Sequence, residues 1–198
     1  RCRLFLMVLK CYPQENVRYT KSTMLQLSGT LPNRAILSLR TGGPVALVTA
    51  PIINPNNLKI EGFFCDDQFS KKHLVLLPQD IRDVVPKGFI VNDHDVLAEP
   101  EDLVRLKDIL KLHFELLNKP VSTTSKKRLG KVNDYAFETS SMYIQKLYVG
   151  QSLIKSFSGG QLGVDRTQIV EITNRQIVIH DPLQGIKDTA PAGAPVAT

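Results

Sequence analysis

The chain has 198 residues, of which 42% are hydrophobic, 7% aromatic and 22% charged, and it contains no tryptophan. This composition is that of a globular protein and excludes a largely disordered chain. The formal net charge of +6 is concentrated at the N-terminus, where residues 1–23 hold five basic residues against Glu15. The remaining chain has 20 basic and 18 acidic residues, a balance too even to indicate nucleic-acid binding over the whole surface.

Residues 1–23 have no clear hydrophobic period, and Met24 directly precedes the first patterned segment. We expect this stretch to be an N-terminal extension outside the fold, and one interpretation is that it is upstream sequence read as coding. Its apolar run over residues 4–9 is too short to cross a bilayer, so no membrane anchor is expected. The three cysteines, Cys2, Cys11 and Cys65, have no framework or metal-ligand spacing, which favours a cytoplasmic location.

Residues 24–97 are predicted to form a first module of short β-strands. Segments rich in β-branched residues alternate with turn residues, which is typical of an all-β sandwich or barrel. Glycine frees φ, proline fixes it and asparagine tolerates a left-handed backbone, so residues 42–44 and 54–57 are expected to be turns. Strands are expected near residues 35–39, 45–53, 58–65, 73–77 and 89–92.

Residues 98–117 are predicted to form an amphipathic helix that joins two modules. Pro100, Glu101 and Asp102 suit a first helical turn, and leucines and one phenylalanine then recur at three- and four-residue spacing up to Leu117. The predicted polar face carries Arg105, Lys107, Asp108 and Lys111. The apolar stripe is expected to pack on a module or between the two, with a helix that docks a partner as the alternative.

Residues 118–184 are predicted to form a second module with strands near residues 120–123, 130–138, 143–148, 153–157 and 176–180. Ser158-Gly159-Gly160 is expected to be a hairpin turn. The tail, residues 185–198, is rich in alanine, proline and glycine and is predicted to be disordered.

The two modules are related by an internal repeat. At an offset of 88 residues, Ile81 aligns with Ile169, and the triplet of residues 89–91 aligns with residues 177–179. Earlier in the modules the offset is about 85, and Asn33 aligns with Asn118. Charge and apolar positions are both kept, so the sequence predicts a duplication with small changes in loop length.

These segments resemble the PRC-barrel family. The resemblance lies in the glycine-rich entry to a strand at residues 42–45, the Leu-Pro-Gln-Asp-Ile run at residues 77–81, and the Arg-Leu-Gly-Lys-Val-Asn-Asp run at residues 128–134. It implies a mainly β fold of two tandem small antiparallel β-barrels joined by the amphipathic helix. It also implies a non-catalytic adaptor that mediates protein–protein interaction. Members include ribosome maturation factors, whose C-terminal barrel is distantly similar, and the H subunit of photosynthetic reaction centres.

No pattern in the sequence predicts catalysis. The four histidines, His73, His94, His113 and His180, lie in different predicted elements without metal-ligand spacing. His180-Asp181 aligns with Asn92-Asp93, and asparagine cannot carry out the proton chemistry of histidine, so the shared aspartate is expected to serve a turn. We therefore expect no enzyme activity, no cofactor, no metal site and no small-molecule substrate.

One charge difference between the modules indicates a partner-binding surface. Lys126, Lys127, Arg128 and Lys131 cluster in the second module, which has nine basic and five acidic residues over 118–184. The first module has seven of each over 33–97. The cluster favours an acidic protein partner, with a ribosome- or RNA-associated factor in RNA processing or ribosome maturation as the alternative, and a plain solvated turn is the simpler interpretation.

Overall fold

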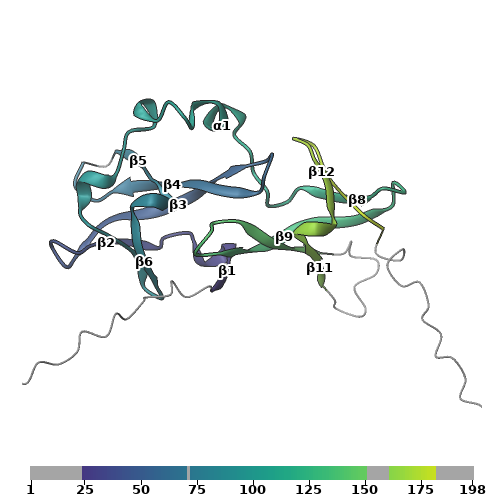
Figure 1. Ribbon diagram of the computed structural model, residues 1–198, viewed down its shortest axis with the longest axis horizontal. Helices are drawn as coiled ribbons and strands as arrows, with labels where there is room; N and C mark the ends of the chain where they lie inside the picture. The colour runs from purple at the N-terminus through teal and green to yellow at the C-terminus, as the bar shows by residue number, and fades with distance from the viewer. Residues whose placement is uncertain (1–23, 71, 151–160, 182–198) are drawn as a thin grey trace, which may run out of the picture.

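The computed structural model describes residues 24–70, 72–150 and 161–181, and this part of the chain is mainly β. It contains two mixed sheets that lie side by side along the long axis of the molecule, and one short α-helix (Figure 1). The predicted strand at residues 153–157, the N-terminal extension and the tail lie outside the described residues.

The first sheet contains six strands in the order β5-β4-β3-β2-β7-β6. All neighbours are antiparallel except β2 and β7, which run parallel, so the sheet is mixed and not wholly antiparallel as predicted. The order is a linear path, and hydrogen bonding among the described residues closes no barrel. The strands are β2 (Ala35–Ser38), β3 (Pro44–Asn54), β4 (Lys59–Asp67), β5 (His73–Leu76), β6 (Ile81–Val85) and β7 (Gly88–Val91).

The second sheet repeats this arrangement in the order β11-β10-β9-β8-β13-β12, again with one parallel pair, β8 with β13. Each strand of the first sheet therefore has a counterpart six strands later. The strands are β8 (Pro120–Thr123), β9 (Arg128–Glu138), β10 (Ile144–Gly150), β11 (Gln161–Asp165), β12 (Ile169–Ile172) and β13 (Ile177–Ile179). The short 3₁₀ turns before β6 (Pro78–Asp80) and β12 (Arg166–Gln168) also correspond.

The predicted duplication agrees with these equivalences in detail. Asn33 and Asn118, aligned from sequence, both have a left-handed backbone. The Asn33 N–H donates to the Val48 carbonyl and the Asn118 N–H to the Val132 carbonyl, both at 2.8 Å. The predicted triplets at residues 89–91 and 177–179 lie in β7 and β13, which hold the same place in the two sheets.

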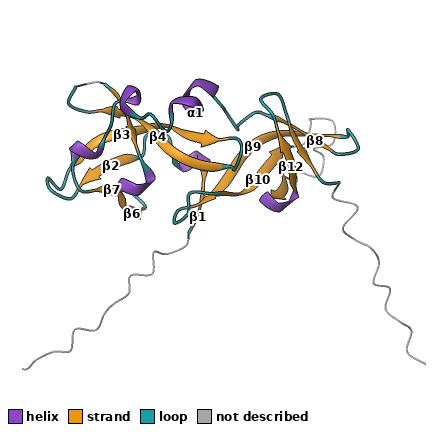
Figure 2. Cartoon of the chain, turned by 45° about the horizontal axis from the view of Figure 1, so that its top comes forward, coloured by secondary structure: helices purple, strands orange, loops and turns teal. Residues whose placement is uncertain are grey.

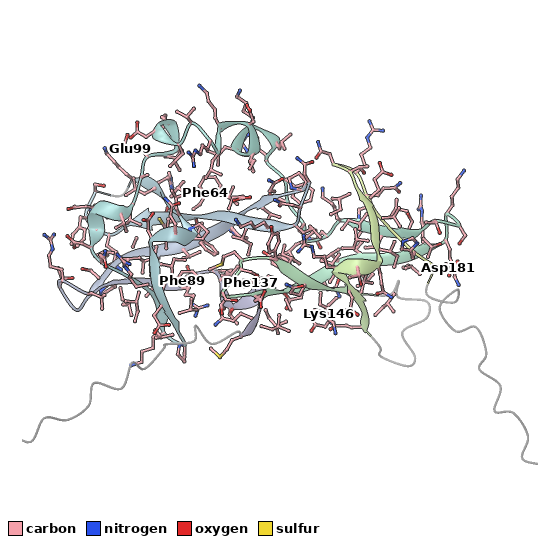
Figure 3. The ribbon with its side chains drawn as sticks, in the orientation of Figure 1. Phe64, Phe89, Glu99, Phe137, Lys146 and Asp181 are labelled. Atoms are coloured by element: carbon pink, nitrogen blue, oxygen red, sulfur yellow. The ribbon has the colours of Figure 1, made fainter. Side chains whose placement is uncertain are left out.

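The two sheets meet at their long hairpins, around an approximate two-fold relation. The Ile60 N–H donates to the Met142 carbonyl and the Ile144 N–H to the Leu58 carbonyl, both at 2.8 Å. Leu58 and Met142 each have a positive φ, so both hairpin turns place their last residue in the same unusual conformation. Buried residues of both sheets belong to one continuous hydrophobic core, and Figure 3 labels Phe89 in the first sheet and Phe137 near the junction.

An additional strand crosses from the first half to the second. β1 (Leu25–Leu27) pairs with the end of β9, which makes the second sheet seven-stranded. A 3₁₀ turn (Ser28–Thr30) follows, where the Ser28 N–H donates to the Asp134 carboxylate at 3.1 Å. The prediction had placed these residues in the first module without a strand. Figure 1 shows β1 beside β9, at the junction of the sheets.

The predicted four-turn helix over residues 98–117 is wrong. These residues contain one 3₁₀ turn (Pro100–Asp102) and one six-residue helix, α1 (Lys107–Leu112), and another 3₁₀ turn (His94–Val96) precedes them. Leu103, with ψ of 70°, is not helical, and His113 has a left-handed backbone that ends α1. Leu116, which lies off the predicted stripe, is the linker residue most deeply buried, so burial in the core outweighs the helical period. Figure 2 shows α1 as a short coil above the strands.

Candidate partner-binding surface

The turn between β8 and β9 carries two of the four basic residues predicted as a partner site, Lys126 and Lys127, and β9 carries the other two, Arg128 and Lys131. We call Lys126, Lys127, Arg128 and Lys131 the basic cluster, and all four side chains are exposed. Thr123, which is buried, fixes the turn, because its N–H donates to the Lys127 carbonyl and its Oγ1 accepts from the Lys127 N–H. The turn is thus held from its buried side, and its cations face solvent.

Lys126 occupies a position where the first module has glycine. In the first module the Ser38 N–H donates to the Gly43 carbonyl, as Thr123 does to Lys127, so Gly42 corresponds to Lys126 and the second turn is one residue shorter. The φ values are 72° for Gly42 and 62° for Lys126. A left-handed backbone is strained for a residue with a Cβ, so lysine is held here against its conformational preference.

A hydroxyl relay ties the basic turn to the end of β13. Thr123 Oγ1 lies 2.7 Å from Ser125 Oγ, and Ser125 Oγ donates to Asp181 at 2.8 Å. The corresponding aspartate, Asp93, accepts from Ser38 Oγ at 3.1 Å. Both shared aspartates therefore serve a turn, as expected from sequence. Figure 3 labels Asp181 at the outer end of the second sheet, far from the junction.

The two corresponding turns differ in how their cations are paired. Arg40 of the first turn forms an ion pair with Asp93. No member of the basic cluster forms an ion pair with any residue that the structure describes. The first turn therefore neutralises its own charge, and the second presents its charge to solvent.

An open hollow of about 640 Å³ lies on the sheet next to the basic turn. Arg128 and Lys131 lie on its lining together with polar side chains of Ser122, Asn133 and Gln176 and the bare backbone of Gly150. No sequence pattern predicted this hollow. It depends on strand register, because β9 and β10 bring Lys131 opposite Gly150.

A second hollow, of about 520 Å³, lies between the linker and the first sheet. Its lining mixes Lys59 and Arg105 with Glu61 and Asp102, and Lys59 already lies 3.7 Å from Glu61. Because both signs of charge are present and partly paired, this hollow has no preference for an ion of either sign.

The histidines are dispersed among separate contacts. His73 Nδ1 lies 2.6 Å from Asp66 and His94 Nε2 lies 2.9 Å from Asp67, at the outer end of the first sheet. Burial by itself would raise the pKa of the Asp67 carboxyl, but donors from Ser70, His94 and the Phe69 backbone lower that pKa well below its usual range. His113 lies in the linker and His180 follows β13. Within the described ranges, no group of three potential metal ligands is found.

Cys65 is buried in β4, and its Sγ donates to the Leu74 carbonyl at 3.3 Å. Burial, followed by the nearby carboxylates of Asp66 and Asp67, raises the pKa of its thiol to about 12. This thiol is therefore protonated at neutral pH and is a poor nucleophile.

The chain matches no protein-family model and no curated protein. Among the described residues, no helix is both long and apolar enough to span a membrane.

Proposed function

We propose that the chain is a non-catalytic adaptor of PRC-barrel type, which acts in the cytoplasm and binds an acidic protein partner through the basic cluster. The observation that carries the proposal is the contrast between two corresponding turns. Arg40 is paired within its own module, whereas Lys126 and its neighbours are exposed, concentrated and without an ion pair among the described residues. Duplicated modules share the residues that fold them, so a charge present in one copy alone is freer to serve binding.

We infer that each set of six corresponding strands, β2–β7 and β8–β13, is one PRC-barrel-like module. The repeated strand order and the repeated parallel pair support a small β-module used twice. Both sheets contribute buried residues to one continuous core, and the hydrogen bonds of the described residues give each sheet a linear strand order. The resemblance would then concern the arrangement of strands around the core.

The backbone strain at Lys126 supports a role for the turn beyond connection. Gly42 meets the same left-handed requirement at no cost in the first module. A lysine at this position therefore adds a positive charge and lowers the stability of the fold. Strain of this kind is found at binding and catalytic sites.

A ribosome- or RNA-associated factor is the alternative function, because phosphates are also attracted to clustered lysine and arginine. Single-stranded RNA is usually bound by aromatic side chains on which bases stack. Among the described residues, those that line the hollow beside the basic cluster include no aromatic side chain. An acidic protein is therefore the better match to this surface.

The proposed function is tested by affinity capture from cells with the full chain as bait. We expect an acidic protein to be captured by the wild type and lost when Lys126, Lys127, Arg128 and Lys131 are replaced by alanine. A control variant with alanine at Arg82, Lys87, Arg105 and Lys107, which are exposed cations elsewhere, should capture it as the wild type does. Equal capture by both variants, or capture abolished by ribonuclease, would contradict the proposal.

A further inference from the structure

The hollow beside the basic turn exists because two facing positions differ between the modules. In the first sheet Leu47 of β3 faces Asp66 of β4. Val48 and Val132 hold the same place, since each accepts from its module's left-handed asparagine. Lys131 therefore corresponds to Leu47, and Gly150, which faces Lys131, corresponds to Asp66.

These replacements reverse the local charge. A leucine and a carboxylate in the first sheet give way to an ammonium and a residue without a side chain. Arg128 adds a second cation at the same end of β9, where the first module has Pro44. The surface that is acidic in the first module is therefore basic in the second.

Gly150 also shapes the hollow. A Cβ built on Gly150 would lie 2.2 Å from the Asn133 side chain, closer than any real contact. The Asn133 amide thus lies directly across the bare backbone of β10. Any larger residue at position 150 would displace this amide and fill the floor of the hollow.

The chemistry of the lining suits a carboxylate. The guanidinium of Arg128 can bind a carboxylate through two parallel hydrogen bonds, and Lys131 supplies a second positive charge. Asn133, Gln176 and Ser122 add neutral donors, and Leu129 and Pro120 provide apolar contact.

We propose that this hollow binds a glutamate or aspartate side chain of an extended, acidic protein segment, with Arg128 and Lys131 on its carboxylate. Lys126 and Lys127, in the turn before β9, attract further negative charge on the same segment. This inference rests on the proposed function and adds the part of the partner that is recognised.

The test measures fluorescence anisotropy of the full chain with a short labelled peptide in which glutamate alternates with serine. A matched peptide with glutamine in place of glutamate, and a short oligouridine RNA, serve as comparison probes. We expect the glutamate peptide to bind more tightly than both. Equal binding of the glutamine peptide, or tighter binding of the RNA that depends on the basic cluster, would overturn the inference.

Variants that copy the first module then locate the site. Lys131→Leu should weaken glutamate-peptide binding by about 1.5- to 5-fold, which is the range for one exposed ion pair. The triple change Lys131→Leu, Asn133→Thr and Gly150→Asp installs the residues found at Leu47, Thr49 and Asp66, and the added carboxylate should weaken binding roughly tenfold or more. Arg105→Gln with Lys107→Gln removes two charges elsewhere and should change little. Circular dichroism checks that each variant is folded.

Binding in the hollow and binding by the basic turn are distinguished by their variants. If Lys126→Ala with Lys127→Ala abolishes peptide binding while Lys131→Leu and the triple variant bind as the wild type does, the hollow is not the site and the adaptor proposal stands. If none of these variants weakens binding, the basic cluster binds no acidic partner and both proposals fail.

Discussion

The outer ends of the two sheets share one strand order but differ in how their charged side chains are paired. In the first, Arg40 pairs with Asp93, and Asp66 and Asp67 contact His73 and His94. In the second, the exposed cations of the basic cluster have no ion pair among the described residues. One copy of the repeated module thus pairs the cation of this turn internally, while the other leaves its cations exposed and without an ion pair among the described residues.

The largest expected effect is on the free energy of unfolding. Substitutions in the core test whether the two sheets are one folding unit. Phe89 packs against Phe63 with ring centroids 4.8 Å apart, and it is fully buried. Its counterpart in the second sheet, Ile177, is also fully buried. Phe89→Ala should lower the free energy of unfolding by about 3–5 kcal/mol, and Ile177→Ala by about 2–5 kcal/mol.

Because the core is continuous, either substitution should shift a single cooperative transition. Urea unfolding monitored by circular dichroism and by tyrosine fluorescence measures this. Two separated transitions, with only one of them shifted, would show that the two sheets unfold independently, as separate domains.

A smaller effect on stability is expected at Asp67, the last residue of β4 in the first sheet. The Asp67 carboxylate is buried and accepts hydrogen bonds from Ser70 and His94, so Asp67→Asn should lower the free energy of unfolding by about 1–3 kcal/mol at pH 7. The folded-state pKa of Asp67 lies below its unfolded value. This stabilisation is therefore complete above the unfolded pKa of about 3.9, and it is lost as pH falls through the folded-state pKa.

Thermal melts at a series of pH values compare the wild type with Asp67→Asn. The stability difference should be constant from pH 7 to about pH 5 and should shrink below about pH 4. A difference that grows on acidification would contradict the assigned role of this carboxylate.

The duplication was predictable from sequence because strand patterning and turn residues are local signals. Asn33 and Asn118 report their left-handed backbone directly, since asparagine is enriched there. The aligned triplets at residues 89–91 and 177–179 gave the correct topological match. The strands β6, β11 and β12 were missed, because most of their residues are exposed or half-buried.

The features that could not be predicted from sequence depend on contacts between residues far apart in the chain. β1 is three residues long and is stabilised by pairing with β9, more than a hundred positions away in sequence. The linker has a helical period, but Phe114 and Leu116 are drawn into the core and the helix is short. The basic cluster was predictable as charge. The hollow was not, because Lys131 faces Gly150 only through the register of β9 and β10.

The corresponding turns also differ in backbone strain, because Lys126 stands where the first module has Gly42. Lys126→Gly should raise the free energy of unfolding by about 0.5–1 kcal/mol, because glycine adopts a positive φ without steric cost. Gly42→Lys should lower it by about 1 kcal/mol, and open space around Gly42 leaves φ as the source of the cost. Opposite shifts in chemical denaturation would confirm that lysine is held at position 126 against stability. Equal shifts of the same sign would contradict it.

The smallest expected effect on stability comes from the whole basic cluster. Replacing Lys126, Lys127, Arg128 and Lys131 by alanine should change the melting temperature by no more than a degree or two, since exposed, unpaired cations contribute little to folding. The same variant should bind an acidic partner more weakly, by about 1–3 kcal/mol in total, since exposed pairs give about 0.2–1 kcal/mol each. Salt screens exposed charges, so raising the ionic strength should weaken the wild type more than the variant. Calorimetric titration at two salt concentrations measures both quantities. Equal affinity and equal salt dependence would mean that the two turns differ in charge without differing in function.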